Sequence, residues 1–528
     1  MSVVLLTPPK PVDWTYSARA EIPDLVIEFA RTYYIATAPD GTLGAQPRPT
    51  PPSAPPVAWD GHIYVYDPRR GVWVGESDEI MQIYVAELAK MQLVAKMSVD
   101  ASGEVREKVW DPGTNEIVTT ARAALARMIT AADRMGFHAP SGPPVIGFTD
   151  GVLILTPGGL ERRDHDPSYL LRTRYEFPVP DVSTARPRPR RFNQYLSDTF
   201  WDREAPDPTA EIAADRDRTV YLRRWIGRML MGLGAGHGSR VLMLIGRAGT
   251  GKSTAVDIIK GLLPDVSEAT NTDPTMWMAD QYRVANIAGK KLAYCSDLAL
   301  HSSRDRVIPT EVIKSAAYGE QIEIRKMRTA PETITPIAAH LWAANALPRT
   351  SDFGGALADR IAVIYLQRRL RGTGEEVVDM AGEILRAERA EIIADCLAAA
   401  AQQLVEDGYR PYRVPPIPFP KSMARLIDDA RYESDPVAEF FARYSVPADH
   451  EIPLSERIQQ SDALDAYNTW ALANKKAKNA LTSRTFGKRI DDCGIRRLKS
   501  NSGQTLMATW SKDAPLKKSI PDLDDLVG

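Results

Sequence analysis

The clearest feature of the hydrophobic pattern is an alternation of short apolar runs with longer amphipathic stretches, between residues 239 and 367. Four runs have the length and composition of strands buried on both faces: 241–245, 291–295, 337–344 and 361–366. Residues 254–263 read as a helix closed by Pro264, and residues 375–406 are also predicted to be helical. Strands that alternate with helices predict an α/β nucleotide-binding domain with a parallel sheet.

The pattern on either side predicts smaller domains. Upstream, short strands are expected at 62–66, 71–74 and 151–155, and helices at 77–99, 119–135, 192–201 and 218–233. Downstream, three helices precede two strands, at 437–444, 461–474, 483–493, 495–498 and 505–510. Three helices followed by a hairpin are typical of a winged helix. Proline-rich stretches at 46–56, 186–191 and 411–420 separate these regions, because proline is excluded from helix and sheet interiors.

Composition narrows the class of protein. Hydrophobic residues make up 44% of the 528 residues and charged residues 25%, as in an ordinary globular protein. We expect neither a membrane span nor a signal peptide, because no apolar run is long enough and residues 1–11 lack the required order. Cys295, Cys396 and Cys493 are far apart in the sequence, so neither a disulfide framework nor a cysteine-rich zinc site is predicted.

The run at 241–245 leads directly into a glycine-rich loop that matches G-x-x-x-x-G-K-[ST] in full. Strand, loop and helix follow one another in the order that phosphate binding requires. Glycines let backbone N–H groups approach phosphate oxygens, Lys252 is expected to reach the β- and γ-phosphates, and Ser253 to ligate Mg²⁺. The predicted nucleotide-binding residues are Gly246, Arg247, Ala248, Gly249, Thr250, Gly251, Lys252, Ser253 and Thr254.

Three further polar residues stand at the ends of predicted strands. Asp297 follows the run at 291–295, where a carboxylate can hold Mg²⁺ or polarise the attacking water. Asn345 follows the run at 337–344, where an amide can orient water against the γ-phosphate. Arg360 precedes the run at 361–366 and could stabilise transition-state charge on a nucleotide held by an adjacent subunit. Each residue type also has an ordinary structural use, as a helix cap, a turn residue or a surface charge.

Together these features resemble the superfamily 3 helicases. The resemblance is carried by the glycine-rich loop, the strand with Asp297, Ile313-Lys314 with Tyr318-Gly319-Glu320, the strand with Asn345-Ala346-Leu347-Pro348, and Asp359-Arg360-Ile361. It is closest to the phage, plasmid and poxvirus-type helicases, which are often labelled primase or primase-helicase. Residues 59–64, 71–73 and 148–153 resemble the N-terminal helicase-associated domain of that family, and the likeness extends over about residues 55 to 512.

The resemblance implies a hexameric ring of AAA+-like cores that binds ATP with Mg²⁺ at subunit interfaces and translocates on single-stranded DNA. It implies catalytic roles for Lys252, Asp297 (second acidic motif), Asn345 (sensor) and Arg360 (trans-acting finger), with Ser253 and Asp297 at the metal. The family usually carries a glutamate or paired acids where this chain has Asp297-Leu298, so the identity of the catalytic base stays open. We expect no primer synthesis, because no zinc-binding cysteine cluster or paired-acid signature precedes residue 240.

DNA contacts are expected at two places. Runs at 321–324 and 333–335 bracket a basic turn with Lys326 and Arg328, which reads as a β-hairpin; in the family a hairpin here projects into the channel. The formal net charge is −2, but residues 475–499 are strongly basic and contain Arg484, Lys488, Arg489, Arg496, Arg497 and Lys499. Such a face suits phosphates, although a solvated helix or a protein-binding winged helix would have the same composition.

The expected fold class is α/β: an AAA+-like P-loop NTPase core with a parallel sheet, flanked by an α+β N-terminal domain and a small winged-helix-like C-terminal domain. The expected parts begin with an N-terminal segment with a proline-rich linker (1–56), the N-terminal domain (57–190) and a helical collar for oligomerisation (191–238). The ATPase domain (239–408), a linker (409–434), the winged-helix-like domain (435–512) and a flexible tail (513–528) follow.

We therefore expect an ATP-dependent replicative helicase of a phage or other mobile element, in the cytoplasm of a bacterial host. Its partners would be single-stranded and forked DNA, five further copies of itself, and a separate primase or replication initiator. The alternative is a non-unwinding AAA+ protein, either an origin-binding initiator or a helicase loader, which would share the ATP site but lack the channel hairpin. A packaging motor is a third interpretation, but the tail lacks the clustered acids of a nuclease domain.

Overall fold

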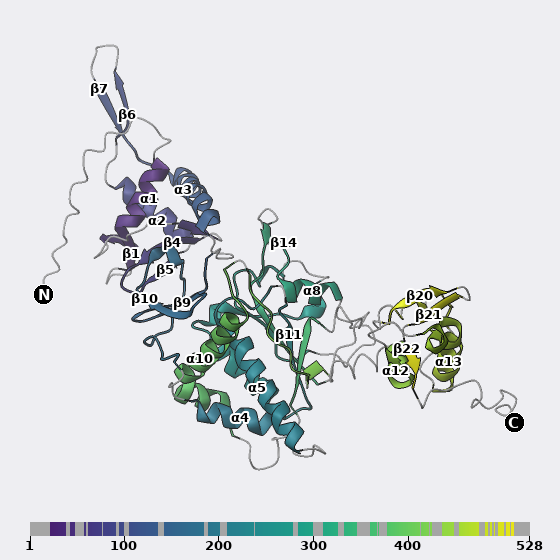
Figure 1. Ribbon diagram of the computed structural model, residues 1–528. Helices are drawn as coiled ribbons and strands as arrows, with labels where there is room; N and C mark the ends of the chain where they lie inside the picture. The colour runs from purple at the N-terminus through teal and green to yellow at the C-terminus, as the bar shows by residue number, and fades with distance from the viewer. Residues whose placement is uncertain are drawn as a thin grey trace. The chain divides into compact units, whose positions relative to one another are not determined.

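The structure of the protein is a computed structural model (Figure 1). It describes residues 22–37, 43–47, 57–59, 62–76, 78–90, 94–99, 105–135, 142–183, 188–200, 208–236, 238–277, 284–298, 310–325, 332–345, 359–366, 368, 377–411, 413–421, 423–424, 436–447, 453–474, 481–483, 486–487, 490, 495–500, 503–506 and 508–511. The chain divides into two compact units. The first comprises Met1–Arg186, Leu263–Glu268 and Leu404–Arg413, and the second comprises Pro187–Leu262, Ala269–Gln403 and Val414–Gly528.

Among the described residues up to Arg186, the first unit contains three α-helices and several small antiparallel sheets. The helices are α1 (Ile22–Thr32), α2 (Asp78–Ala89) and α3 (Thr114–Met135). The strands are β1 (Tyr33–Thr37), β2 (Leu43–Pro47), β3 (Val57–Trp59), β4 (His62–Asp67), β5 (Val72–Glu76), β6 (Val94–Val99), β7 (Val105–Val109), β8 (Val145–Phe148), β9 (Gly151–Thr156) and β10 (Gly159–Arg163). They form the sheets β1-β2, β3-β4-β5, β6-β7 and β10-β9-β8.

One core joins the three helices of this unit. Ile22, Leu25, Val26, Phe29 and Ala30 of α1 are buried, at the i, i+3, i+4, i+7, i+8 spacing of a single helix face. They pack in one cluster with residues of β4, α2 and α3. The hydrophobic pattern did not predict α1, which shares its core with elements of the expected 57–190 domain.

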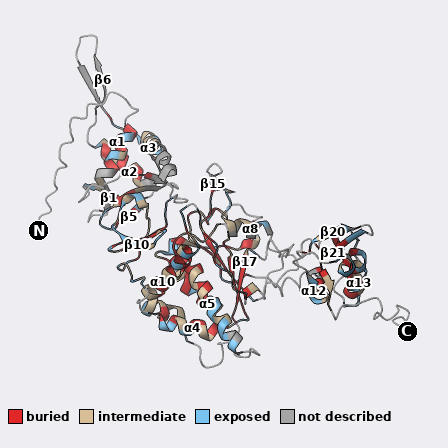
Figure 2. Cartoon of the chain, in the orientation of Figure 1, coloured by how far each residue is buried: buried red, intermediate tan, exposed pale blue. Residues whose placement is uncertain are grey.

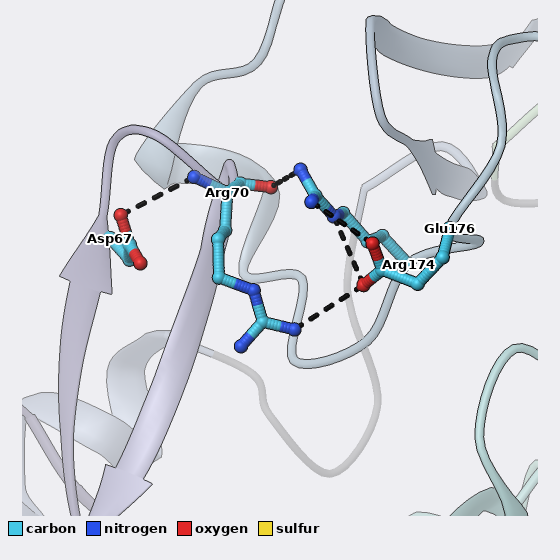
Figure 3. Close-up of polar contacts among 4 residues, drawn as sticks. All are labelled: Asp67, Arg70, Arg174 and Glu176. Atoms are coloured by element: carbon cyan, nitrogen blue, oxygen red, sulfur yellow. Dashed lines mark hydrogen bonds and ion pairs between the residues drawn. The ribbon is translucent and has the colours of Figure 1, made fainter.

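The turn between β4 and β5 is fixed by polar contacts, which Figure 3 shows in close-up. The Asp67 carboxylate accepts hydrogen bonds from the backbone N–H groups of Arg69 (2.9 Å) and Arg70 (3.3 Å). Arg174 donates to the Arg70 carbonyl at 2.8 Å and pairs with Glu176 at 3.1 Å, while Arg70 pairs with the same carboxylate at 3.4 Å. A segment distant in sequence thus holds the turn at 67–70 in place.

Several predicted boundaries in this unit need correction. The helix expected at 77–99 ends at Ala89, and Val94–Val99 is strand β6, paired with β7. An apolar stretch of this length is ambiguous, and here pairing with β7 decides its conformation. Helix α3 begins at Thr114, five residues before the predicted start at 119. Residues 46 and 47 of the predicted proline-rich loop end strand β2, where a terminal proline is tolerated.

The second unit is built on a five-stranded parallel sheet of order β12-β13-β16-β11-β17. Its strands are β11 (Val241–Ile245), β12 (Ala269–Asn271), β13 (Leu292–Cys295), β16 (Ala339–Ala344) and β17 (Ile361–Tyr365). The first strand in sequence, β11, therefore lies between the fourth and the fifth. The four predicted strands are confirmed to within two residues at either end, and the α/β class with a parallel sheet is confirmed.

The apolar runs form these strands because helices and connecting segments cover the sheet. Every residue of β11 and β16 is buried, and Figure 2 shows the strand residues in red along the sheet. Helix α6 (Lys252–Gly261) contacts β16, and α8 (Thr310–Tyr318) contacts β11 and β16. Met243, Trp342 and Val363 from three neighbouring strands share one apolar cluster. Between α8 and β16, strands β14 (Ile322–Ile324) and β15 (Glu332–Ile334) form the predicted antiparallel hairpin.

Three helices flank this sheet in the sequence: α4 (Arg190–Phe200), α5 (Pro208–Leu230) and α10 (Met380–Glu406). The buried Asp395 carboxylate of α10 forms 2.7 Å ion pairs with Arg188, which precedes α4, and with Arg223 of α5. Helix α5 begins at Pro208 rather than the predicted 218, and α10 begins at Met380 rather than 375. An oligomerising role for residues 191–238 stays a prediction.

The C-terminal region has its own core. It contains α12 (Pro436–Tyr444), β18 (Ser445–Pro447), β19 (Ile458–Gln459), α13 (Gln460–Ala473), β20 (Arg497–Ser500), β21 (Gly503–Leu506) and β22 (Ala508–Trp510). Phe440, Phe441, Tyr467, Trp470 and Phe486 pack in one aromatic cluster. The predicted strand at 505–510 is two strands with different partners, β21 with β19 and β20, and β22 with β18. Most of the predicted helix at 483–493 lies outside the described residues, so the winged helix stays a prediction.

In the part of the chain that the structure describes, no helix has the length and apolar character required to cross a membrane.

Candidate nucleotide-binding site

The glycine-rich loop lies at the carboxyl edge of the parallel sheet, between β11 and α6. Gly249 and Gly251 have φ angles of +83° and +89°, which side-chain-bearing residues rarely adopt. A Cβ atom on Gly246 would lie 2.6 Å from the Leu366 carbonyl oxygen and 2.7 Å from the Thr250 hydroxyl. Thr250 is almost fully buried, and its hydroxyl donates to the Arg247 carbonyl at 2.9 Å. The loop therefore needs glycine at these positions to keep its closed shape.

Lys252 begins helix α6, and its ammonium group turns back into the loop. Its Nζ donates to the Gly246 carbonyl, to the Arg247 carbonyl at 2.9 Å and to the Asn345 side-chain oxygen at 3.0 Å. Burial lowers the pKa of Lys252 below its ordinary value, and the nearby Asp297 carboxylate opposes this shift. The lysine is therefore held by neutral acceptors, with one acidic side chain close enough to favour its charged form.

Asp297 and Asn345 reach this place because parallel strands end at a common edge. Asp297 follows β13 and Asn345 follows β16, which lies directly between β13 and β11. Both side chains are exposed, and the Leu298 N–H donates to the Ala343 carbonyl at 2.8 Å, which fixes the backbone after Asp297. Ser253, exposed in the first turn of α6, and Thr254 belong to the same edge. The structure thus brings Lys252, Asp297 and Asn345 together.

Helix α4 also contacts the loop, and sequence reasoning missed this contact. The Tyr195 hydroxyl donates to the Gly251 carbonyl at 2.9 Å, across 56 residues of sequence. A Cβ atom on Gly251 would lie 3.3 Å from the Thr199 methyl group. Asp198 of the same helix pairs at 3.3 Å with Arg368, just beyond β17. No motif marks these residues, because only the packing of α4 brings them to the loop.

Arg360 lies at the opposite edge of the sheet. It precedes β17, and its carbonyl accepts from the N–H of Val241 at the start of β11, at 2.8 Å. Its guanidinium carbon lies 4.2 Å from the centroid of the Tyr318 ring. The five residues of β11 span about 16 Å, which separates Arg360 from the loop of its own chain. Arg360 is therefore the one predicted catalytic residue that the fold does not bring to the others.

The candidate DNA contacts are only partly within the described residues. Lys326, Arg328, Arg484, Lys488 and Arg489 lie outside them. Arg496, Arg497 and Lys499 are described, at and just before strand β20. Arg496 and Lys499 are exposed, and Arg497 donates to the Gln504 side chain of β21 at 2.9 Å. The predicted roles of all eight residues stay predictions.

The groups at this edge of the sheet are of the chemical types that bind a nucleotide with Mg²⁺. The closed glycine loop leaves no room for a Cβ atom at Gly246, and Gly251 offers no side chain to cap helix α6. Uncapped helix N-termini and glycine loops bind phosphates, and Mg²⁺ prefers hydroxyl and carboxylate oxygens such as those of Ser253 and Asp297. These residues would hold the phosphates and the metal, which together would neutralise charge on the terminal phosphate.

Comparison with known proteins finds one family model, which matches residues 244–360 and is described as a family of unknown function (DUF5906). No curated protein matches. Among solved structures, the A form apo structure of the NrS-1 C-terminal region is 13% identical, with a TM-score of 0.34. A further apo structure of the same region is 11% identical, with a TM-score of 0.33. Each alignment covers 69% of this chain and 96% of the solved chain, at TM-scores too low to assign a shared fold.

Proposed function

We propose that this protein is an ATP-dependent replicative DNA helicase of a phage or other mobile element that works as a ring of six copies. One observation carries the proposal. Lys252, Asp297 and Asn345 converge on the glycine loop at one edge of the parallel sheet, whereas Arg360 lies at the other edge. This division fits a nucleotide site that is completed by a second copy of the chain.

Within one copy, Lys252 is the residue that exchanges partners when a nucleotide binds. Its ammonium group leaves two backbone carbonyls and the Asn345 amide for phosphate oxygens, because hydrogen bonds between charged groups are stronger than those to neutral acceptors. Asn345 is thereby released to orient a water molecule against the γ-phosphate. Ser253 and Asp297 hold Mg²⁺, and Asp297 polarises the attacking water if no other acid serves as the base.

Arg360 contacts the nucleotide that is bound to a neighbouring copy. An arginine side chain is much shorter than the span of about 16 Å along β11, so Arg360 does not reach the loop of its own chain. An arginine supplied from an adjacent subunit stabilises charge on the terminal phosphate in the transition state. In a closed ring every nucleotide site is completed in the same way, because each copy supplies one arginine and receives one from its neighbour.

DNA is held by the basic residues Lys326 and Arg328, which lie between β14 and β15 in the sequence, and by the basic C-terminal residues Arg496, Arg497 and Lys499. The hairpin and the nucleotide site belong to the same unit. ATP hydrolysis therefore moves the hairpin, and the DNA backbone bound to it moves along. The C-terminal residues, beyond a proline-rich stretch, strengthen initial binding. Both contributions weaken as salt rises, because bound phosphates release counterions.

The test is unwinding of a forked duplex by the full-length chain with ATP and Mg²⁺, together with mass measurement in the presence of nucleotide. We expect strand displacement by a particle of six copies. Hydrolysis without strand displacement would favour the alternative, an AAA+ initiator or helicase loader. A monomer that hydrolyses ATP at its full rate would contradict the ring.

Lys252→Ala is the matched control for this test. We expect it to abolish hydrolysis and unwinding, because the β- and γ-phosphates lose their fixed cation. Thermal unfolding verifies that the variant is folded. Unwinding at the wild-type rate by this variant would remove the glycine loop from the proposed mechanism.

A further inference from the structure

Arg360 is bonded to strand β11 through its backbone, and its guanidinium packs against an aromatic ring. Its backbone is fixed to the first residue of β11 by the 2.8 Å hydrogen bond from Val241. Its guanidinium carbon lies 4.2 Å from the centroid of the Tyr318 ring, within the range of a cation–π contact. Both Arg360 and Tyr318 are partly buried. The side chain is thus directed by Tyr318 before any neighbouring copy is present.

Arg240 contacts the residues on both sides of Arg360. Its guanidinium donates to the Ile361 carbonyl at 3.1 Å and lies 3.7 Å from the Asp359 carboxylate. It also stacks on Phe419, with 4.0 Å from the guanidinium carbon to the ring centroid. Hydrogen bonds therefore hold the backbone beside Arg360, and the Tyr318 ring is one contact through which the direction of its guanidinium can change.

Tyr318 is also part of the base of the β14–β15 hairpin. It is the last residue of α8, and β14 begins four residues later at Ile322. Gly319, with φ +60°, lies so close to Pro336 that an added Cβ atom would be 2.8 Å from its carbonyl oxygen. Pro336 follows β15, whose Ile334 pairs with Ile322. The two ends of the hairpin therefore meet beside Tyr318.

We propose that Tyr318 is a positioning residue that couples DNA held at the β14–β15 hairpin to Arg360. The ring directs the guanidinium toward the neighbouring copy, and a displacement of the hairpin shifts the ring and with it the direction of Arg360. Engagement of DNA on one copy would thus change the rate of hydrolysis on the next. This inference rests on the proposed function, in which Arg360 completes the site of an adjacent copy.

The experiment compares ATP hydrolysis by full-length wild-type protein, Tyr318→Leu and Tyr318→Phe, with and without a single-stranded oligothymidine. We expect Tyr318→Leu to lower the DNA-stimulated kcat about fivefold, the factor that loss of an arginine–ring contact gives. The KM for ATP and the affinity for the oligonucleotide should stay unchanged, because the glycine loop and the hairpin charges are intact. Tyr318→Phe keeps the ring and should retain the stimulation.

Phe419→Leu is the matched control, because it removes the ring that stacks on Arg240, while the hydrogen bond from Arg240 to Ile361 and the ring on Arg360 are retained. We expect it to keep the wild-type DNA stimulation. Equal loss of stimulation in Phe419→Leu and Tyr318→Leu, or in Tyr318→Phe and Tyr318→Leu, would overturn the proposal. If Tyr318→Leu does not fold, Tyr318→Met, which fills a similar volume without a ring, carries the same expectations.

The double variant Tyr318→Leu/Arg360→Ala separates this inference from the proposed function. If Tyr318 acts through Arg360, the double variant hydrolyses ATP no more slowly than Arg360→Ala alone. Additive losses would overturn the coupling. Hydrolysis by Arg360→Ala at the wild-type rate would instead contradict the proposed role of Arg360. An impaired Arg360→Ala beside an unimpaired Tyr318→Leu would contradict the coupling alone.

Discussion

His340 is a titratable residue in the middle of the apolar sheet. It is 2% exposed, and its ring makes edge contacts with Trp277 at 5.3 Å and Trp342 at 6.1 Å. Burial lowers the pKa of His340 to about 3. In the unfolded chain a histidine titrates near pH ~6.5. Below that pH the unfolded state binds a proton that the folded state excludes, so the free energy of unfolding falls as the pH falls.

We predict a loss of about 1.4 kcal/mol per pH unit from this histidine between pH ~6.5 and the folded pKa. Urea unfolding at pH 7.5, 6 and 5 measures it. The variant His340→Phe, which cannot titrate, should show a shallower acid dependence by that amount. The other histidines and the carboxylates are common to both proteins, so equal slopes would contradict the assignment to His340.

Asp395 is a second residue whose burial determines how much it contributes to stability. Its side chain is 2% exposed and pairs at 2.7 Å with the exposed Arg188 and with the largely buried Arg223, whose charge loses its partner when Asp395 is removed. Removing one member of a buried ion pair leaves an uncompensated charge. We predict that Asp395→Asn lowers the free energy of unfolding by about 3 kcal/mol, measured by urea denaturation.

The matched control is Asp379→Asn, which removes a pair with Arg386 whose side chains are 59% and 69% exposed. A solvated pair of this kind contributes below about 1 kcal/mol, so the control should change stability little. A similar loss in both variants would show that burial is not what makes Asp395 important.

At the scale of elements, α4 is the helix that supports the glycine loop. Its N-terminus is capped by the Glu388 carboxylate of α10, which accepts from the N–H groups of Arg191 (2.8 Å) and Phe192 (2.9 Å). Its Tyr195 donates to Gly251, and burial raises the pKa of Tyr195, so the hydroxyl stays a donor at all working pH values. The loop is thus linked through α4 to α10.

We predict that Tyr195→Phe weakens ATP binding about fivefold, the equivalent of one hydrogen bond of about 1 kcal/mol. Titration with a fluorescent ATP analogue gives the Kd. Tyr221→Phe, which removes a hydroxyl from another buried tyrosine, is the control and should bind nucleotide as the wild type does. If both variants lose affinity equally, the effect belongs to the helical packing rather than to the bond with Gly251.

At the scale of the whole molecule, the separation of Arg360 from its own glycine loop predicts complementation between copies. Arg360→Ala should bind ATP and keep only a small residual rate of hydrolysis, and Lys252→Ala should be inactive. Mixed with each other, they should recover part of the activity, because some interfaces then combine an intact loop with an intact arginine. The readout is hydrolysis by mixed rings whose composition is verified by mass. No recovery in verified mixed rings would argue against a shared site.

Much of the core could be predicted from the sequence by itself. Strands buried on both faces must be apolar along their whole length, so the runs around Val241–Ile245 and Ala339–Ala344 could form little else. The glycine loop is recognisable because phosphate binding requires those residue types at that spacing. Parallel strands end at a common edge, so Asp297 and Asn345 were expected near Lys252, as the structure has them.

Only the tertiary structure decided the contacts between elements distant in the chain. The strand Val94–Val99 depended on its pairing with β7, which a local hydrophobic pattern does not contain. The contact of Tyr195 with Gly251 and the stacking of Tyr318 on Arg360 depend on how helices pack against the sheet. A periodic pattern specifies which face of an element is buried, but the partner that covers that face is set by the packing of the whole chain.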